Sequence, residues 1–98
     1  MYRNKEATLT LINAAGYSDI VNKLLIEARE NIKIARSYLV EFEEVKPAKQ
    51  LMRLMYELLW FYPEEKARIT LRLEGNNLRV LLVDREERRG RKGMKEYR

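Results

Sequence analysis

The fold is decided by residues 67–83, which read ARITLRLEGNNLRVLLV. Apolar and polar side chains alternate on both sides of the central Gly75-Asn76 pair, a pattern that is typical of a β-hairpin with a two-residue turn. If Glu74 faces Asn77, the facing apolar pairs are Leu73 with Leu78, Leu71 with Val80 and Ile69 with Leu82. One face of the ribbon is then wholly apolar, and a slip of one residue would bury arginines instead. We therefore predict antiparallel strands over residues 67–74 and 77–84.

The sequence before the hairpin predicts two helices that cover its apolar face. Over residues 18–44, apolar residues recur at alternating intervals of four and three, which indicates one long helix. This stripe consists of Val21, Leu25, Ala28, Ile32, Ala35, Leu39 and Phe42. Pro47 suits the first position of a second helix, which we expect over residues 47–61, before Pro63. The two alanines of the stripe allow a close approach, so we predict that the two helices pack antiparallel.

The N-terminal segment fits two structures. Residues 6–12 alternate as a strand does, whereas residues 7–15 would suit a short helix ended by Gly16. We prefer an edge strand over residues 6–12, because a two-stranded ribbon is only marginally stable and a third strand would support it. The predicted fold class is α+β, with a two-helix antiparallel hairpin packed on a small antiparallel β-sheet. It forms one domain of residues 1–85, and a charged, basic and flexible tail follows over residues 86–98.

The composition excludes most catalytic chemistry. The chain has no cysteine and no histidine, which removes thiolate chemistry, cysteine-ligated metal sites and the side chain that most often transfers protons near neutral pH. The sequence shows no phosphate-binding glycine loop and no histidine that would activate a serine. We therefore predict that the protein is not an enzyme, and we expect no cofactor, no metal site and no small-molecule substrate.

Charge and hydropathy indicate the source and the compartment. Charged residues make up 36% of the chain, which favours a thermophilic source. The densest apolar stretch, residues 51–62, contains Arg53 and Glu57 and is too short to span a bilayer. The N-terminus shows no convincing cleavage site of a signal peptide. We expect no membrane association and a cytoplasmic location.

The net charge of +5 comes from the C-terminal end of the chain. Residues 1–87 carry 14 basic and 14 acidic side chains, so they sum to zero. The cations of the tail that would contact phosphates are Arg88, Arg89, Arg91, Lys92 and Lys95. Such a segment follows a phosphate backbone and releases counterions on binding, which predicts nucleic-acid binding. The alternatives are a solubilising extension, an acidic protein or a membrane surface.

Three arginines form a second candidate patch on the outward face of the hairpin. The predicted register places Arg72 opposite Arg79, with Arg68 further along the same ribbon. Like charges that face each other destabilise a ribbon, and a phosphate between them would relieve the repulsion. Alternatively, a carboxylate such as Glu74 or Asp84 neutralises the pair. We predict no aromatic side chain on this face, which weakens the case for base stacking there.

Two further clusters have a structural and a functional interpretation. Trp60, Phe61 and Tyr62 could stack on bases or bind a partner, but we favour a core role in which they hold the helix against the hairpin. Glu41, Glu43 and Glu44 could bind Mg²⁺, but we favour a solvated helix end.

The leading functional hypothesis is a non-catalytic nucleic-acid-binding protein. RNA or single-stranded DNA is favoured over duplex DNA, because the sequence suggests no helix with a polar, basic reading face. The rival hypothesis is an assembly or adaptor subunit, such as a homodimer formed through the stripe of residues 18–44 or a complex formed through the Trp60 region. A small inhibitor protein is a third alternative.

Overall fold

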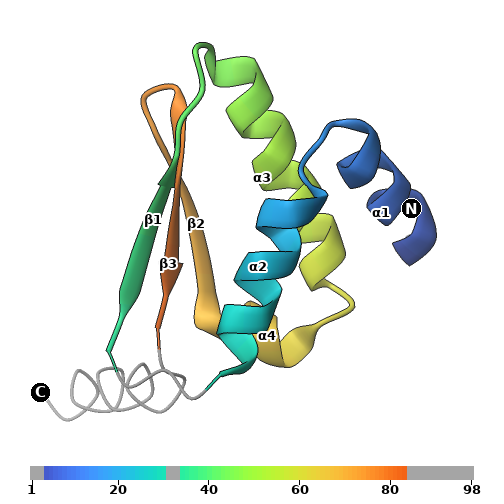
Figure 1. The fold of residues 1–98 in the computed structure, drawn as a ribbon, viewed down its shortest axis with the longest axis vertical. Coiled ribbons are helices and arrows are strands. Elements are labelled where there is room, and N and C mark those ends of the chain that lie inside the picture. The colour runs from blue at the N-terminus through green and yellow to red at the C-terminus, as the bar shows by residue number, and fades with distance from the viewer. Residues whose placement is uncertain (1–3, 31–33, 84–98) are drawn as a thin grey trace, which may run out of the picture.

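The computed structural model describes residues 4–30 and 34–83, and in these residues four helices lie on one side of a three-stranded antiparallel sheet (Figure 1). The elements are α1 (Lys5–Ala14), α2 (Ser18–Arg29), β1 (Arg36–Val40), α3 (Val45–Leu59), α4 (Pro63–Arg68), β2 (Ile69–Glu74) and β3 (Asn77–Leu82). The predicted α+β class is confirmed. None of the described helices is long and apolar enough to cross a bilayer.

The hairpin of β2 and β3 forms in the predicted register. Leu71 faces Val80, Arg72 faces Arg79 and Glu74 faces Asn77. Gly75 has a φ of +62°, and glycine adopts this value without strain at the first central position of a hairpin turn. The turn is also tied to the segment before α3: the side chain of Asn77 accepts a hydrogen bond from the backbone N–H of Phe42 at 3.1 Å.

The third strand comes from a part of the chain where we predicted helix. The sheet order is β1-β3-β2, so β3 is central and β1 pairs with it antiparallel. The predicted helix over residues 18–44 is therefore wrong beyond Arg29. The facing pairs are Arg36 with Leu82, Tyr38 with Val80 and Val40 with Leu78. A spacing of four places Ala35 and Leu39 on one face of a strand as well as of a helix, and pairing with the free edge of β3 decides between the two.

The N-terminal segment is helix α1 and not the edge strand predicted over residues 6–12. The side chain of Asn4 caps this helix by accepting a hydrogen bond from the backbone N–H of Ala7 at 3.0 Å. Thr8 and Thr10 fit a helix because their hydroxyls donate to backbone carbonyls one turn earlier. Since β1 already supplies the third strand, the N-terminus is free to pack as a helix against α3.

The core lies between the sheet and the helices that cover it. Leu78, Val80 and Leu82 of the central strand are fully buried. The side chains that α3 contributes to the core are Ala48, Leu51, Leu54, Met55, Leu58 and Leu59. The second predicted helix is thus confirmed as α3, with bounds shifted by two residues at each end. The other face of the sheet carries no helix in the described part of the chain (Figure 1).

We predict that Leu78→Ala lowers the free energy of unfolding by about 2–5 kcal/mol, because it leaves a cavity under the central strand. Leu11→Ala is the matched control: Leu78 is 0% exposed and Leu11, on the outer side of α1, is 55% exposed. The control should change stability by less than about 1 kcal/mol. Urea unfolding followed by circular dichroism measures both, and equal losses would contradict this placement of the core.

Candidate nucleic-acid interface

The three arginines predicted as a patch have different surroundings in the structure. Arg68 lies at the end of α4, where its guanidinium donates to the backbone carbonyl of Ala28 at 2.6 Å and to that of Glu30 at 3.3 Å. These carbonyls are at the C-terminal end of α2, where backbone acceptors have no partner within the helix. Arg68 therefore caps α2 and ties it to α4.

Arg72 and Arg79 do face each other, but Glu74 neutralises both. One oxygen of the Glu74 carboxylate lies 2.6 Å from Nη2 of Arg72, and the other lies 3.1 Å from Nη2 of Arg79. Both arginines hydrogen-bond to Glu74 and hold its pKa below the ordinary value. The hydrogen bond from Arg79 is the larger cause, and that from Arg72 is the next. Arg79 also donates to the hydroxyl of Ser37 on β1 at 3.0 Å. Of the two interpretations of this pair, the structure supports neutralisation by a neighbouring carboxylate.

Several residues that we predicted to be functional lie outside the described residues or in another position than expected. Arg88, Arg89, Arg91, Lys92 and Lys95 lie outside the described residues, as does Asp84. Glu41, Glu43 and Glu44 lie between β1 and α3, so the helix end predicted for them is wrong. In the described residues, no group of three acidic side chains is placed to hold a metal ion.

The three aromatic residues after α3 do not all join the core. Trp60 is 54% exposed, so the predicted core role is wrong for this residue. Tyr62 packs against the core, and Nζ of Lys5 and the guanidinium of Arg29 lie 4.8 and 5.5 Å from the centre of its ring. Nζ of Lys66 lies 5.7 Å from the centre of the Trp60 ring. The exposed indole therefore stands beside a cation.

A basic and aromatic stripe runs along the solvent side of α3 and leads to Trp60. Its members, which we call the α3 stripe, are Lys46, Lys49, Arg53, Tyr56 and Trp60. They recur at intervals of three and four, so they occupy one face of a helix, and all five are exposed. The core positions Leu51, Met55 and Leu58 repeat on the opposite face. The stripe is thus the outer side of the helix that covers the sheet.

The cations of the α3 stripe differ from the arginines of the sheet in their surroundings. Among the described residues, no carboxylate forms an ion pair with Lys46, Lys49 or Arg53. Glu57 lies at the margin of the stripe, one position after Tyr56. The hydroxyl of Tyr56 donates to the backbone carbonyl of Leu71 at 3.3 Å, which holds its ring at the edge of β2. This surface therefore combines aromatic side chains with cations that have no ion-pair partner in the part of the chain that the structure describes.

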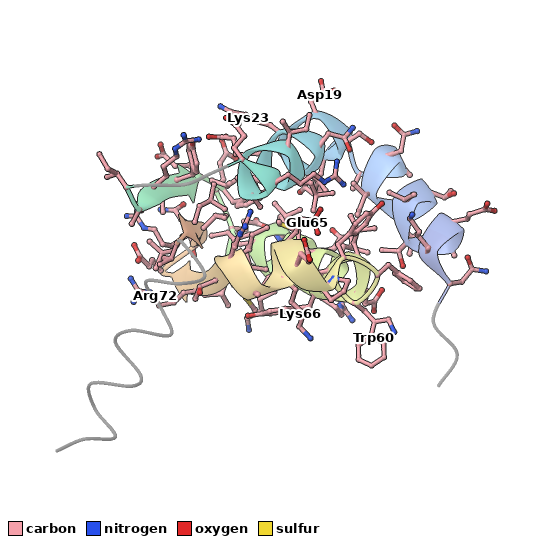
Figure 2. All side chains as sticks on the ribbon, turned by 90° about the horizontal axis from the view of Figure 1, so that it is seen from below. Asp19, Lys23, Trp60, Glu65, Lys66 and Arg72 are labelled. Atoms are coloured by element: carbon pink, nitrogen blue, oxygen red, sulfur yellow. The ribbon has the colours of Figure 1, made fainter. Side chains whose placement is uncertain are left out.

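The C-terminal end of the α3 stripe lies near a cation of α4. Figure 2 shows Trp60 and Lys66 along the lower side of the molecule in that view, with Asp19 and Lys23 on the opposite side. Nζ of Lys66 lies over the Trp60 ring. The aromatic end of the stripe is therefore next to a cation of α4.

The α3 stripe was not predicted, because this helix is apolar almost all round when its aromatic residues are counted as apolar. The spacing of Lys46, Lys49 and Arg53 was visible, and it continues through Tyr56 to Trp60. Aromatic residues count as apolar in a periodicity pattern. Tyr56 and Trp60 are exposed, but counting them as apolar made the predicted buried face of the helix too wide. A search for cations and aromatics at intervals of three and four would have found the surface.

A partly buried carboxylate, that of Glu27, joins α2 to β1. One oxygen of Glu27 accepts hydrogen bonds from the hydroxyl of Tyr38 and from Nη1 of Arg36, the latter at 2.8 Å. The hydrogen bond from Tyr38, with a further contribution from Arg36, lowers the pKa of Glu27 despite its burial, and the same bond raises the pKa of Tyr38. The second oxygen of Glu27 is buried without a hydrogen-bond partner among the described residues. We interpret this cluster as a structural link that holds the edge strand β1 in place.

Comparison with protein-family models, with curated proteins and with solved structures finds no match for this chain. The function must therefore be inferred from the residues and their geometry.

We predict that Glu27→Gln lowers the free energy of unfolding at pH 7 by about 1.5–3 kcal/mol, because it weakens two hydrogen bonds to a charged group. The lowered pKa of Glu27 means that its contribution is present above the ordinary value of 4.5 and is lost as the pH falls through the lower folded value. Stability of the parent protein should therefore fall on acidification below about pH 4.5. The variant should show a shallower fall.

Urea unfolding at a series of pH values tests this prediction. Glu65 and Glu74 also have lowered pKa values, so some acid sensitivity should persist in the variant. Glu6→Gln, on the outer side of α1, is the matched control and should keep the parent profile. An identical pH profile for Glu27→Gln and the parent would contradict the role given to this carboxylate.

Proposed function

We propose that this chain is a non-catalytic nucleic-acid-binding protein whose folded domain contacts phosphates through the α3 stripe. The observation that carries the proposal is the stripe itself. Three cations without a carboxylate partner among the described residues share one helical face with two exposed aromatic rings. A basic patch is typical of nucleic-acid-binding proteins, and cations combined with exposed aromatic rings are typical of those that bind single strands.

The charge balance of residues 1–87 indicates that the cations of the α3 stripe are a local feature of the surface. Residues 1–87 sum to zero, so a patch of cations that have no ion-pair partner within residues 4–30 and 34–83 cannot follow from a general excess of basic residues. Its counter-charges lie elsewhere, and a polyanion would be attracted to one side of the molecule. Each phosphate that a lysine or arginine neutralises releases counterions, which favours binding at low salt.

The proposed contacts divide the basic residues into two groups. Lys46, Lys49, Arg53 and Lys66 contact phosphates. Arg68, Arg72 and Arg79 keep structural roles, because their donors are engaged within the domain. The C-terminal cations from Arg88 to Lys95 add further phosphate contacts. We place this activity in the cytoplasm, where nucleic acids are accessible.

The support for the rival assembly hypothesis is weaker at one of its two surfaces. The stripe of residues 18–44 does not form one helical face: Val21, Leu25 and Ala28 are buried in the core, and Leu39 is on a strand. We therefore do not base a homodimer proposal on that stripe. The Trp60 region is part of the α3 stripe, so the same variants test whether it binds a protein or a nucleic acid.

We predict that Lys49→Glu combined with Arg53→Glu weakens binding to a fluorescent oligonucleotide by roughly tenfold or more at about 50 mM salt. The slope of log affinity against log salt should fall by about two, since two phosphate contacts are lost. Truncation after Glu87 should reduce the slope further, and the two changes should act independently. Fluorescence anisotropy at salt concentrations from about 50 to 200 mM measures both effects.

Lys23→Glu is the control for net charge. It makes the same substitution as Lys49→Glu on a helix at the opposite side of the domain (Figure 2). Equal effects of Lys23→Glu and Lys49→Glu would show that only net charge matters, and the α3 stripe would not be the interface. Absence of oligonucleotide binding by the full chain at low salt would contradict the proposed function as a whole.

A further inference from the structure

We infer that the α3 stripe selects single-stranded nucleic acid, because an unpaired base stacks on Trp60 while the strand lies along the cations of the helix. This inference rests on the proposed function and adds the form of the nucleic acid and the residue that recognises it. The basis is the order of side chains along one helix face: Lys46, Lys49 and Arg53 come first, and the two rings follow.

The presence of a basic helix face reopens the choice between single and double strands. A single strand was expected from the sequence because no helix with a basic face was predicted, and α3 removes that reason. The aromatic members of the stripe supply a different one. In a duplex the bases are stacked on each other, so a side-chain ring beside the helix meets only their edges and the backbone. In a single strand every base offers its face to a ring.

Trp60 has the exposure that a stacking platform needs. Its side chain is 54% exposed and projects outward from the end of α3 (Figure 2). A large apolar ring so exposed costs solvation free energy that a stacked base would recover. Nζ of Lys66 lies over the ring, 5.7 Å from its centre. A base that stacks on that side displaces this ammonium group, which is then available to the phosphate next to the base.

Tyr56 places a second ring one turn before Trp60. It is 48% exposed, and its hydrogen bond to Leu71 restricts the movement of its ring. Residues four apart on a helix are neighbours, so the two rings lie on consecutive turns of one face. From Lys46 to Trp60 the stripe extends about 21 Å at the rise of an α-helix. This length suits a short run of nucleotides that passes cations before it reaches the rings.

The chain contains a single tryptophan, so fluorescence excited at a wavelength that tryptophan absorbs and tyrosine does not reports on Trp60 alone. The experiment titrates the full chain with oligothymidylate, with oligouridylate, with the duplex of oligothymidylate and oligoadenylate, and with heparin as a polyanion without bases. The two single strands should quench the fluorescence and bind more tightly than the duplex. Heparin should bind through charge with little quenching.

Trp60→Ala should weaken single-strand binding by roughly tenfold or more and leave heparin binding unchanged. Trp60→Phe keeps an aromatic ring and should retain most of the affinity, which separates stacking from a structural effect. Far-UV circular dichroism and the thermal midpoint establish that both variants fold, as expected for an exposed position. The fluorescence of the unchanged protein gives an independent test that needs no variant.

The outcomes separate this inference from the proposed function. Equal affinity for single strand and duplex, or single-strand binding without a change in fluorescence, would overturn the role of Trp60. The charge-reversal variants would still test the phosphate contacts in that case. Binding of heparin but of no oligonucleotide would overturn both proposals and would indicate an acidic protein as the partner of this surface.

Discussion

The central strand β3 is the element on which the rest of the fold depends. Its alternation sends Leu78, Val80 and Leu82 into the core, and both of its edges are paired, with β1 on one side and β2 on the other. Every helix that covers the sheet therefore covers the same apolar face. Once α3 has buried one side on this strand, its other side is free to carry residues that contribute nothing to packing. The α3 stripe occupies that side.

The hairpin could be predicted in detail because its determinants are local. The alternation, the Gly75 turn and the facing pairs lie within 17 consecutive residues, and a shifted register would bury Arg72 or Arg79. The pairing of β1 depends instead on a partner about 40 residues away. Ala35 and Leu39 are four residues apart, and this spacing fits one face of a helix as well as one face of a strand, so the local pattern could not distinguish them. The edge strand expected at the N-terminus was a consequence of the same error, because the ribbon needed a third strand and β1 had been assigned to a helix.

The candidate site was less predictable than the fold, since it depends on which cations have partners. The facing pair of Arg72 and Arg79 followed from the register, but the orientation of Glu74 between them did not. Arg68 belongs to the same stretch of sequence, yet its donors reach the end of α2, a contact that only tertiary structure brings about. Trp60 followed a run of buried leucines, and its exposure depends on the turn that the chain makes into α4.

The positions of the carboxylates determine which cations of the described residues have ion-pair partners and which do not. In the described residues, the arginines of α2, β1, β2 and β3 each have a carboxylate partner: Arg29 with Glu65, Arg36 with Glu27, and Arg72 and Arg79 with Glu74. Three of these pairs join different elements of the domain, and the pair of Arg72 and Glu74 lies within β2. The cations of α3 have no such partner there, although residues 1–87 as a whole are neutral. The attraction for a polyanion that we propose would come from this separation of charge, and the C-terminal cations would add to it. The rings of Tyr56 and Trp60 at the end of this stripe would distinguish a nucleic acid, which has bases to stack on them, from a polyanion that has only charge.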